Sequence, residues 1–231
     1  MTELYEGLTT TRSIRRFTDE PVSDDDLAAL LFAASRAPNG SNRNAFRFVV
    51  LRDGPVAKEA KALLGDAFRA TWASMQRSGD YARIATFDLT TAAGRAGSAM
   101  QQFVDRFESI PVVVLPCLVR YRRPDPSEGA SIYPACQNLL LAARARGLGG
   151  VLTMWHGSVE TELRTLLGIP GPGEPGGSEH GIAITATIPI GHPEGNHGPV
   201  RRRPLADVVY DDRWESPAAW AIDPPGTRFT R

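Results

Sequence analysis

Residues 111–119 read PVVVLPCLV, an apolar run near the middle of the chain. A continuous run of this length, rich in β-branched residues, is typical of a strand that is buried on both faces. The run contains Pro116 and falls far short of the roughly 18–20 apolar residues that span a bilayer. It therefore predicts a strand inside a folded core and no membrane segment.

Upstream of this run, the sequence predicts a helix, a strand and a second helix. Ser23 is a good N-cap, and the three aspartates that follow it place negative charge where the helix dipole favours it. The turn residues 38–40 end this helix, and the aromatic run 46–51 follows as a strand. Apolar residues then recur at helical spacing across 60–67.

Downstream of the run, strands and helices continue to alternate. The patterns predict a helix at 131–146, a strand at 149–155, a short helix from Ser158 to Gly168 and a strand at 182–190. The chain therefore contains only about four or five strands. This organisation indicates a mixed α/β or α+β domain, in which a modest central sheet is flanked by helices.

Composition excludes several classes of protein. The 231 residues include 26 basic and 26 acidic side chains, so the formal net charge is zero. A neutral chain lacks the overall field that drives non-specific binding to nucleic acids. Lys58 and Lys61 are the only lysines, so arginine supplies nearly all of the positive charge.

Cysteine and histidine show no metal-ligand spacing. Cys117 and Cys136 are too few for a disulfide scaffold, and the four histidines do not pair at ligand spacings. The N-terminus has no signal-peptide pattern. The sequence therefore predicts buried, reduced cysteines, no bound metal, and a soluble protein of the cytoplasm.

Two arginine clusters lie at opposite ends of the chain, RSIRRF at 12–17 and RRR at 201–203. Arginine is suited to bidentate contacts with phosphate, and a neighbouring serine adds a neutral donor. Alternatively, each cluster is a solvated face paired with acids such as Asp207, Asp211 and Asp212. Charge alone leaves both interpretations open.

A third segment favours the first interpretation. Residues 37–48, APNGSNRNAFRF, are a loop of small hydrogen-bonding residues that leads into an aromatic strand. Together with RSIRRF, the helix and glycine segment 135–150, GHPEG at 191–195 and RRRPL at 201–205, this loop resembles the FMN-dependent nitroreductase family. The resemblance implies an α+β fold with a mixed, mostly antiparallel central sheet flanked by helices. It also implies an intertwined homodimer that binds FMN at the subunit interface.

The resemblance implies a cofactor contact for each of several positions. Arg12 and Ser13 would hold the FMN phosphate, and Arg15 would face the pyrimidine edge of the flavin ring. Arg201 and Arg203 would complete the phosphate site. The loop from the partner subunit corresponds to Pro38, Asn39, Gly40 and Asn42, and the strand end beside the ring corresponds to Leu152, Thr153 and Met154.

The resemblance also divides the chain. Residues 1–213 would form the nitroreductase-like FMN-binding domain, and residues 214–231 would form an extension rich in proline and aromatic residues. Within the domain, residues 70–108 resemble the variable helical region that covers the active site. The sequence of this region predicts several separate helical segments, with breaks near Gly79 and Gly94.

The implied activity is hydride transfer from NADH or NADPH to flavin N5, followed by reduction of a nitroaromatic, a quinone or a similar flat acceptor in a ping-pong mechanism. Trp72, Tyr81 and Phe87 are candidates for stacking on such an acceptor, although helix packing explains them equally well. Alternatives within the same fold are reductive dehalogenation and flavin destruction. An arginine-rich protein that binds nucleic acid is the alternative from another class.

Overall fold

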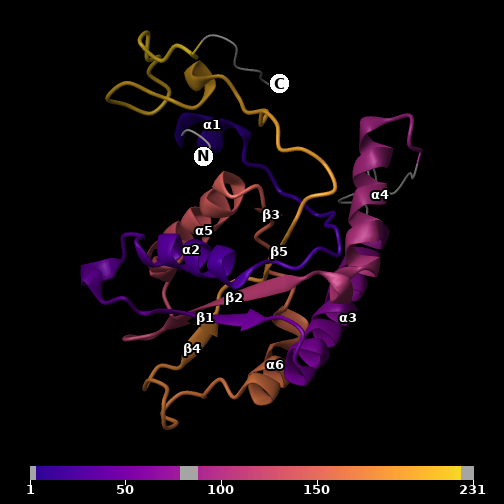
Figure 1. The fold of residues 1–231 in the computed structure, drawn as a ribbon. Helices are drawn as coiled ribbons and strands as arrows, with labels where there is room; N and C mark the ends of the chain where they lie inside the picture. Colours follow the sequence, from indigo (N-terminus) through magenta and orange to yellow (C-terminus); the bar gives the residue numbers. More distant parts are fainter. Residues whose placement is uncertain (1–3, 79–87, 225–231) are drawn as a thin grey trace.

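A computed structural model describes residues 4–78 and 88–224 as an α+β fold around one antiparallel sheet (Figure 1). The strands are β1 (Phe46–Leu51), β2 (Val112–Val119), β3 (Gly149–Gly150), β4 (Ile182–Ile184) and β5 (Ile188–Gly191). Their order is β1-β2-β5-β3, and β4 also pairs with β2. Each pairing between these strands is antiparallel.

Strand β2 is the centre of the fold, and both of its faces are buried as its sequence predicts. Val112, Val114 and Leu118 belong to one hydrophobic cluster, with side chains of α2 (Asp24–Ser35) and α5 (Tyr133–Ala145). Val113, Leu115 and Cys117 belong to a second cluster on the opposite face. This alternation follows from the two-residue period of a strand.

The second cluster is covered by α3 (Pro55–Ser78), α4 (Ala92–Asp105) and α6 (Glu160–Leu167). Lys61 connects α3 to the residues just before β2. Its buried Nζ donates to Ile110 O at 2.7 Å and to Pro111 O at 3.2 Å. A short helix that the sequence patterns did not predict, α1 (Leu4–Thr10), contacts α5. No helix in the described part of the chain is long and apolar enough to cross a membrane.

Two of the helix ends that the sequence predicts are confirmed. Ser23 Oγ accepts a hydrogen bond from Asp26 N at 3.0 Å and caps α2. Gly168 ends α6 with a φ of 62°, a conformation that glycine adopts without a Cβ clash. Ser158 does not cap α6, because it lies in a 3-10 turn (Gly157–Val159) and the helix begins at Glu160.

The predicted strands 149–155 and 182–190 are wrong in length. Pro116 has no N–H to donate, so the ladder on β2 is interrupted there. Both Thr185 N and Thr185 Oγ1 donate to Pro116 O, each at 2.9 Å, and the chain pairs with β2 only on either side as β4 and β5. The 149–155 segment forms β3 and then a single bridge between Thr153 and Thr187.

The predicted helix break near Gly94 lies slightly earlier in the chain, because residues 88–91 are not helical and α4 begins at Ala92. Gly94 lies inside α4, where Thr91 Oγ1 caps the helix by accepting from Gly94 N at 2.9 Å. A Cβ on Gly94 would lie 1.9 Å from Asp88 O, so glycine is required there by a close approach. Gly79 lies outside the described residues.

The C-terminal residues pass beyond α1 at one end of the molecule (Figure 1). Leu205 N donates to Asp223 Oδ1 at 3.2 Å, and Asp211 N donates to Ser216 O at 2.9 Å. These contacts connect residues on the two sides of position 213. The division of the chain at that position stays a prediction.

The N-terminal segment 13–18 lies against the edge formed by β3 and β5. Ile14 N donates to Gly150 O at 3.0 Å, and Thr18 N donates to His192 O at 2.9 Å. A Cβ on Gly149 would lie 2.6 Å from Ile14 Cγ1, so a larger residue cannot fit without a shift. The absence of side chains in β3 therefore allows this segment to dock.

We expect Gly149→Ala to destabilise the fold by about 1–3 kcal/mol, because the added methyl group overpacks the contact with Ile14. In a domain of this size, each kcal/mol lowers Tm by roughly 2–4 °C. Gly157→Ala is the matched control, because a Cβ on Gly157 would extend into open space, with no contact within 4 Å. Equal Tm values for the two variants in thermal unfolding would contradict this account.

Candidate functional site

A cleft of about 860 Å³ lies between the N-terminal segment and the helices α3 and α4. Arg12, Ser13 and Arg15 line one wall, and Trp72 of α3 lines another. The volume falls within the range of about 300–1,000 Å³ that is typical of sites for small molecules and cofactors. Three of the predicted phosphate and ring contacts are therefore brought together at one cleft.

The cleft is strongly positive. Among the described residues, four arginines line it, Arg12, Arg15, Arg16 and Arg95, against a single acidic residue, Glu194. Glu194 is already engaged, because Arg106 Nη1 lies 3.2 Å from its Oε1. An anionic ligand is therefore favoured here.

The second arginine cluster begins beside the first. Gly198 N donates to Thr10 O at 3.3 Å, and Val200 N donates to Thr9 O at 3.1 Å. Arg201 and Arg203 are exposed and do not line the cleft. Within the described residues, neither of them forms an ion pair with a carboxylate, and Arg12 forms none either.

Leu152, Thr153 and Met154 follow β3 and lead to Trp155, which lines the cleft. Thr153 N donates to Thr187 O at 3.0 Å, and Thr187 N donates to Thr153 O at 2.8 Å. Thr153 Oγ1 is buried and has no hydrogen-bond partner within the described residues. Buried polar atoms are normally paired, so this hydroxyl is an exception among the described residues.

The buried side chain of His156 supports this strand end. Its Nε2 lies 3.0 Å from Ile184 O, so Nε2 carries the proton and donates to that carbonyl. Nδ1 then accepts from Thr187 Oγ1 at 3.3 Å. Both ring nitrogens are satisfied, and His156 acts as a structural residue beneath Thr153.

Of the three aromatic substrate candidates, only Trp72 lies in the described residues. Its residue exposure is 2%, it packs in the core, and its Nε1 donates to Gln101 Oε1 at 2.9 Å. Tyr81 and Phe87 lie outside the described part of the chain. A stacking role for the three stays a prediction.

Other cleft residues were not predicted. Arg95, Met100 and Gln102 line the cleft from α4, and Trp155 lines it from the turn after β3. Their local sequence shows only the helical pattern of α4 and the end of a strand. The packing of α4 against α3, which brings the first three to the cleft, is not encoded locally.

The loop predicted to contact the flavin lies elsewhere. Asn39 and Gly40 line a separate cavity of about 210 Å³, together with Arg43 and Tyr121. Pro38 and Asn42 belong to the same loop and line neither cavity. Figure 1 places this loop, between α2 and β1, at the opposite side of the molecule from α4.

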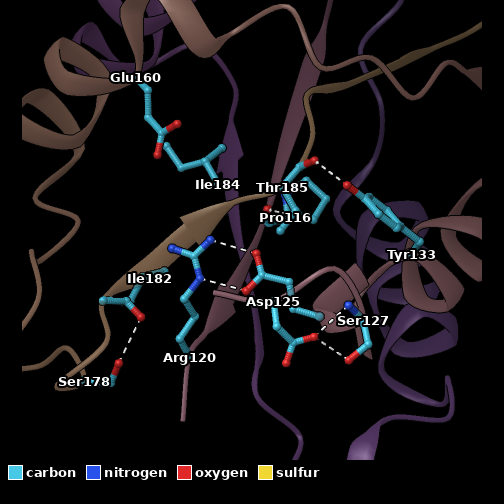
Figure 2. A network of polar contacts seen from close by, with 12 residues as sticks. Pro116, Arg120, Asp125, Ser127, Tyr133, Glu160, Ser178, Ile182, Ile184 and Thr185 are labelled. Atoms are coloured by element: carbon cyan, nitrogen blue, oxygen red, sulfur yellow. Dashed lines mark hydrogen bonds and ion pairs between the residues drawn. The ribbon is translucent and has the colours of Figure 1, made fainter. Parts of the chain in front are cut away.

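Polar contacts fix the second cavity. Gly40 N donates to Ser131 Oγ at 3.1 Å, and the guanidinium of Arg43 lies 4.1 Å from the ring centre of Tyr121. Figure 2 shows the neighbouring network, in which Ser127 Oγ donates to Asp125 Oδ1 at 2.6 Å. Arg120 forms a bidentate pair with Glu128, at 2.8 and 2.7 Å.

Comparisons with known proteins identify the family. Residues 8–191 match the sequence profile described as the nitroreductase family.

The chain belongs to the nitroreductase family.

It is similar to a protein of Archaeoglobus fulgidus that is provisionally named NADH dehydrogenase/NAD(P)H nitroreductase, with 28% identity over 84% of this chain and 87% of the relative. It is also similar to an NADH dehydrogenase of Thermus thermophilus, with 30% identity over 86% of this chain and 90% of the relative.

A solved structure shares the fold. It is an FMN- and NADPH-dependent nitroreductase from Sphigopyxis sp. strain HMH, which matches with a TM-score of 0.66 and 21% identity. The match covers 92% of this chain and all of that structure's chain. In this chain the match to the family profile ends at position 191, so Arg201 and Arg203 lie beyond it.

The nitroreductase chain offers no reactive thiol at the cleft. Burial raises the pKa of Cys117 to about 11 and that of Cys136 to about 12. Both residues pack inside the two hydrophobic clusters. No group of three metal-ligating side chains is present in the described residues.

We expect both cysteines to resist a thiol reagent at pH 8 in the native protein. With a pKa of about 11, roughly one Cys117 thiol in a thousand is ionised at this pH, and Cys136 is ionised less. Labelling in denaturant provides the control and should modify both cysteines. Rapid labelling of the native protein would show that the clusters are open.

Proposed function

We propose that this nitroreductase is an FMN-dependent oxidoreductase that takes hydride from NADH or NADPH and passes electrons to a nitroaromatic, a quinone or a similar flat acceptor. The observation that carries this proposal is the docking of the N-terminal segment on β3, which sets Arg12, Ser13 and Arg15 in the wall of a positive cleft. The names of its relatives, which include NAD(P)H nitroreductase and NADH dehydrogenase, support it.

The residues of the cleft fit FMN. Arg12 and Ser13 supply a cation and a hydroxyl for the phosphate, with Arg201 and Arg203 as further cations on the adjoining segment. The buried Thr11 Oγ1 beside Arg12 has no partner within the described residues. An anion at this position would satisfy it.

The ring of FMN would lie along the cleft toward Leu152, Thr153 and Met154. Bound FMN supplies the hydride acceptor and donor of the reaction, its N5 atom. Arg15, in the wall of the cleft, would set a positive charge beside the pyrimidine edge, and this charge would favour the reduced, more anionic ring. The indole rings of Trp72 and Trp155 make part of the wall apolar and limit the access of water.

The proposed reaction requires little acid or base catalysis from the side chains of the protein. Among the described residues, Glu194 is the one carboxylate in the cleft lining, and its ion pair with Arg106 holds it in place. The acceptor would enter the same cleft after the nicotinamide leaves. Successive use of one face of the ring gives ping-pong kinetics.

A second copy of the chain would complete the site. The loop of Pro38, Asn39, Gly40 and Asn42 lies across the molecule from α4, so it reaches a flavin only in a partner's cleft (Figure 1). Large apolar side chains are exposed on α1 and on the C-terminal residues, including Leu4, Tyr5, Trp214, Trp220 and Ile222. Burying this surface in a homodimer would remove it from water.

The purified protein is therefore expected to be yellow and to release FMN on denaturation. Anaerobic addition of NADH or NADPH should bleach the flavin spectrum, and a nitroaromatic or quinone should restore it. A colourless protein that cannot be reconstituted with FMN would overturn the proposal.

The product of the reaction separates the remaining alternatives. Halide release from a haloaromatic without nicotinamide-driven nitroreduction would favour dehalogenation, and loss of the flavin itself would indicate flavin destruction. Salt-sensitive binding to nucleic acid would favour the remote alternative.

We expect Arg12→Ala to weaken FMN binding by roughly 10- to 100-fold, because it removes a charge-assisted contact to the phosphate. Riboflavin has no phosphate, so its affinity should be unchanged. Arg15→Ala should instead lower the reduction potential of bound FMN. Arg36→Ala is the control, because Arg36 is exposed at the end of α2 and its side-chain contacts are with Ser35 and Phe32. Loss of FMN and riboflavin binding alike in Arg12→Ala would contradict the assignment.

A further inference from the structure

His197 directly precedes Gly198, whose N donates to Thr10 O near the N-terminus. Its Nε2 lies 3.0 Å from Leu148 O. A carbonyl oxygen only accepts, so Nε2 must carry a proton. This contact fixes the ring and leaves Nδ1 as the nitrogen that titrates.

Nδ1 of His197 is buried and has no hydrogen-bond partner within the described residues. The family resemblance assigned no role to this histidine. Thr11 Oγ1 is a second buried atom without a described partner, and it belongs to the residue that precedes Arg12. Two buried polar atoms without a described partner therefore lie on the two segments that carry the predicted phosphate ligands.

The charges that face His197 come from two elements. Burial, and then Arg144 of α5 and Arg12 of the N-terminal segment, hold the pKa of His197 below its usual range, while the bond to Leu148 opposes this shift. Arg144 is balanced, since its Nη2 lies 3.0 Å from Glu6 Oε1. Arg12 forms no ion pair within the described residues.

Arg12 is also close to the backbone that follows His197. A Cβ on Gly198 would lie 3.9 Å from Arg12 Nη1. The guanidinium of Arg12 therefore lies next to the backbone that follows His197, and Thr11 directly precedes Arg12 in the chain. We expect an anion held by Arg12 to reach the Thr11 hydroxyl and the imidazole as well. A phosphate dianion is the natural occupant, because it supplies several acceptor oxygens and the compensating charge.

We propose that His197 is a further binding residue for the FMN phosphate, and that its Nδ1 takes up one proton from solvent when the phosphate binds. This inference rests on the proposed function. Nδ1–H then donates to a phosphate oxygen, while Nε2–H continues to donate to Leu148 O. The imidazolium then compensates part of the hydration free energy that the phosphate loses on leaving water.

The direction of the pH dependence follows from this exchange. The ring is neutral in the free protein at pH 7–8, because its pKa is lowered there. A bound dianion favours the charged ring, so binding and protonation reinforce each other. Affinity for FMN should therefore fall as pH rises through the neutral range.

The test compares FMN with riboflavin on the apoprotein, by quenching of flavin fluorescence between pH 6.5 and 8.5. The wild type should bind FMN roughly tenfold more weakly at pH 8.5 than at pH 6.5, with riboflavin unaffected. Calorimetry in two buffers of different ionisation enthalpy should show proton uptake with FMN and none with riboflavin.

His197→Gln separates the two roles of the ring, because its amide can still donate to Leu148 O but cannot be protonated. It should bind FMN about tenfold more weakly at pH 6.5, lose the pH dependence and keep its affinity for riboflavin. His180→Gln is the matched control. His180 lies in the turn before β4, and this substitution should change none of these values. Wild-type affinity and slope in His197→Gln would overturn the inference.

Failure of the proposed function gives a different result. If the protein binds neither flavin, the imidazole of His197 is titrated by NMR with and without inorganic phosphate. A rise in its pKa with phosphate, absent in Arg12→Ala, supports an anion site that contains His197. No change with phosphate overturns the inference as well.

Discussion

The fold and its cleft depend on one close approach, that of Ile14 to the glycine edge of the sheet. Ile14 N donates to Gly150 O at 3.0 Å, and the Ile14 side chain occupies the space that a Cβ on Gly149 would need. Farther along, a Cβ on Gly191 would lie 3.1 Å from Phe17 Cδ1. Two buried apolar side chains therefore anchor a charged segment. Because Ile14 is fixed inward, Ser13 and Arg15 on either side of it are held in the wall of the cleft.

The strand end at residues 152–154 depends on an interruption in the central strand. Pro116 cannot donate to the ladder, and Thr185 supplies two donors to its carbonyl oxygen. The chain then continues to Thr187, whose backbone pairs with Thr153 and whose hydroxyl donates to His156 Nδ1. A short polar network thus holds the strand end at residues 152–154, where a regular ladder would have continued β3. The buried hydroxyl of Thr153 has no hydrogen-bond partner within the described residues.

Local patterns were sufficient for those elements whose determinants lie within a few residues of each other. Strand β1 and strand β2 occupy the predicted residues, and the Ser23 cap of α2 is confirmed. The separation of β4 from β5 could not be predicted, because Pro116 sets it from a distant part of the sequence. At the site, RSIRRF pointed to Arg12, Ser13 and Arg15, whereas Arg95 and Gln102 reach the cleft only through the packing of α4. The position of Gly94 could not be predicted for a related reason. Glycine is required there by a close approach to Asp88 O, and helix propensity contains no information on such a contact.

The neutral composition of the chain conceals a strong local field. Arginines with structural roles have carboxylate partners, as in the contacts of Arg69 with Glu108 and of Arg120 with Glu128. In the part of the chain that the structure describes, Arg12 has no such partner, and Glu194 is the one acidic residue that lines its cleft. Salt screens exposed charges over about 10 Å, so carboxylates elsewhere on the surface balance the net charge without cancelling the potential inside the cleft. Zero net charge therefore argues against a long polyanion as partner and is compatible with one small anion, bound where the two ends of the chain meet.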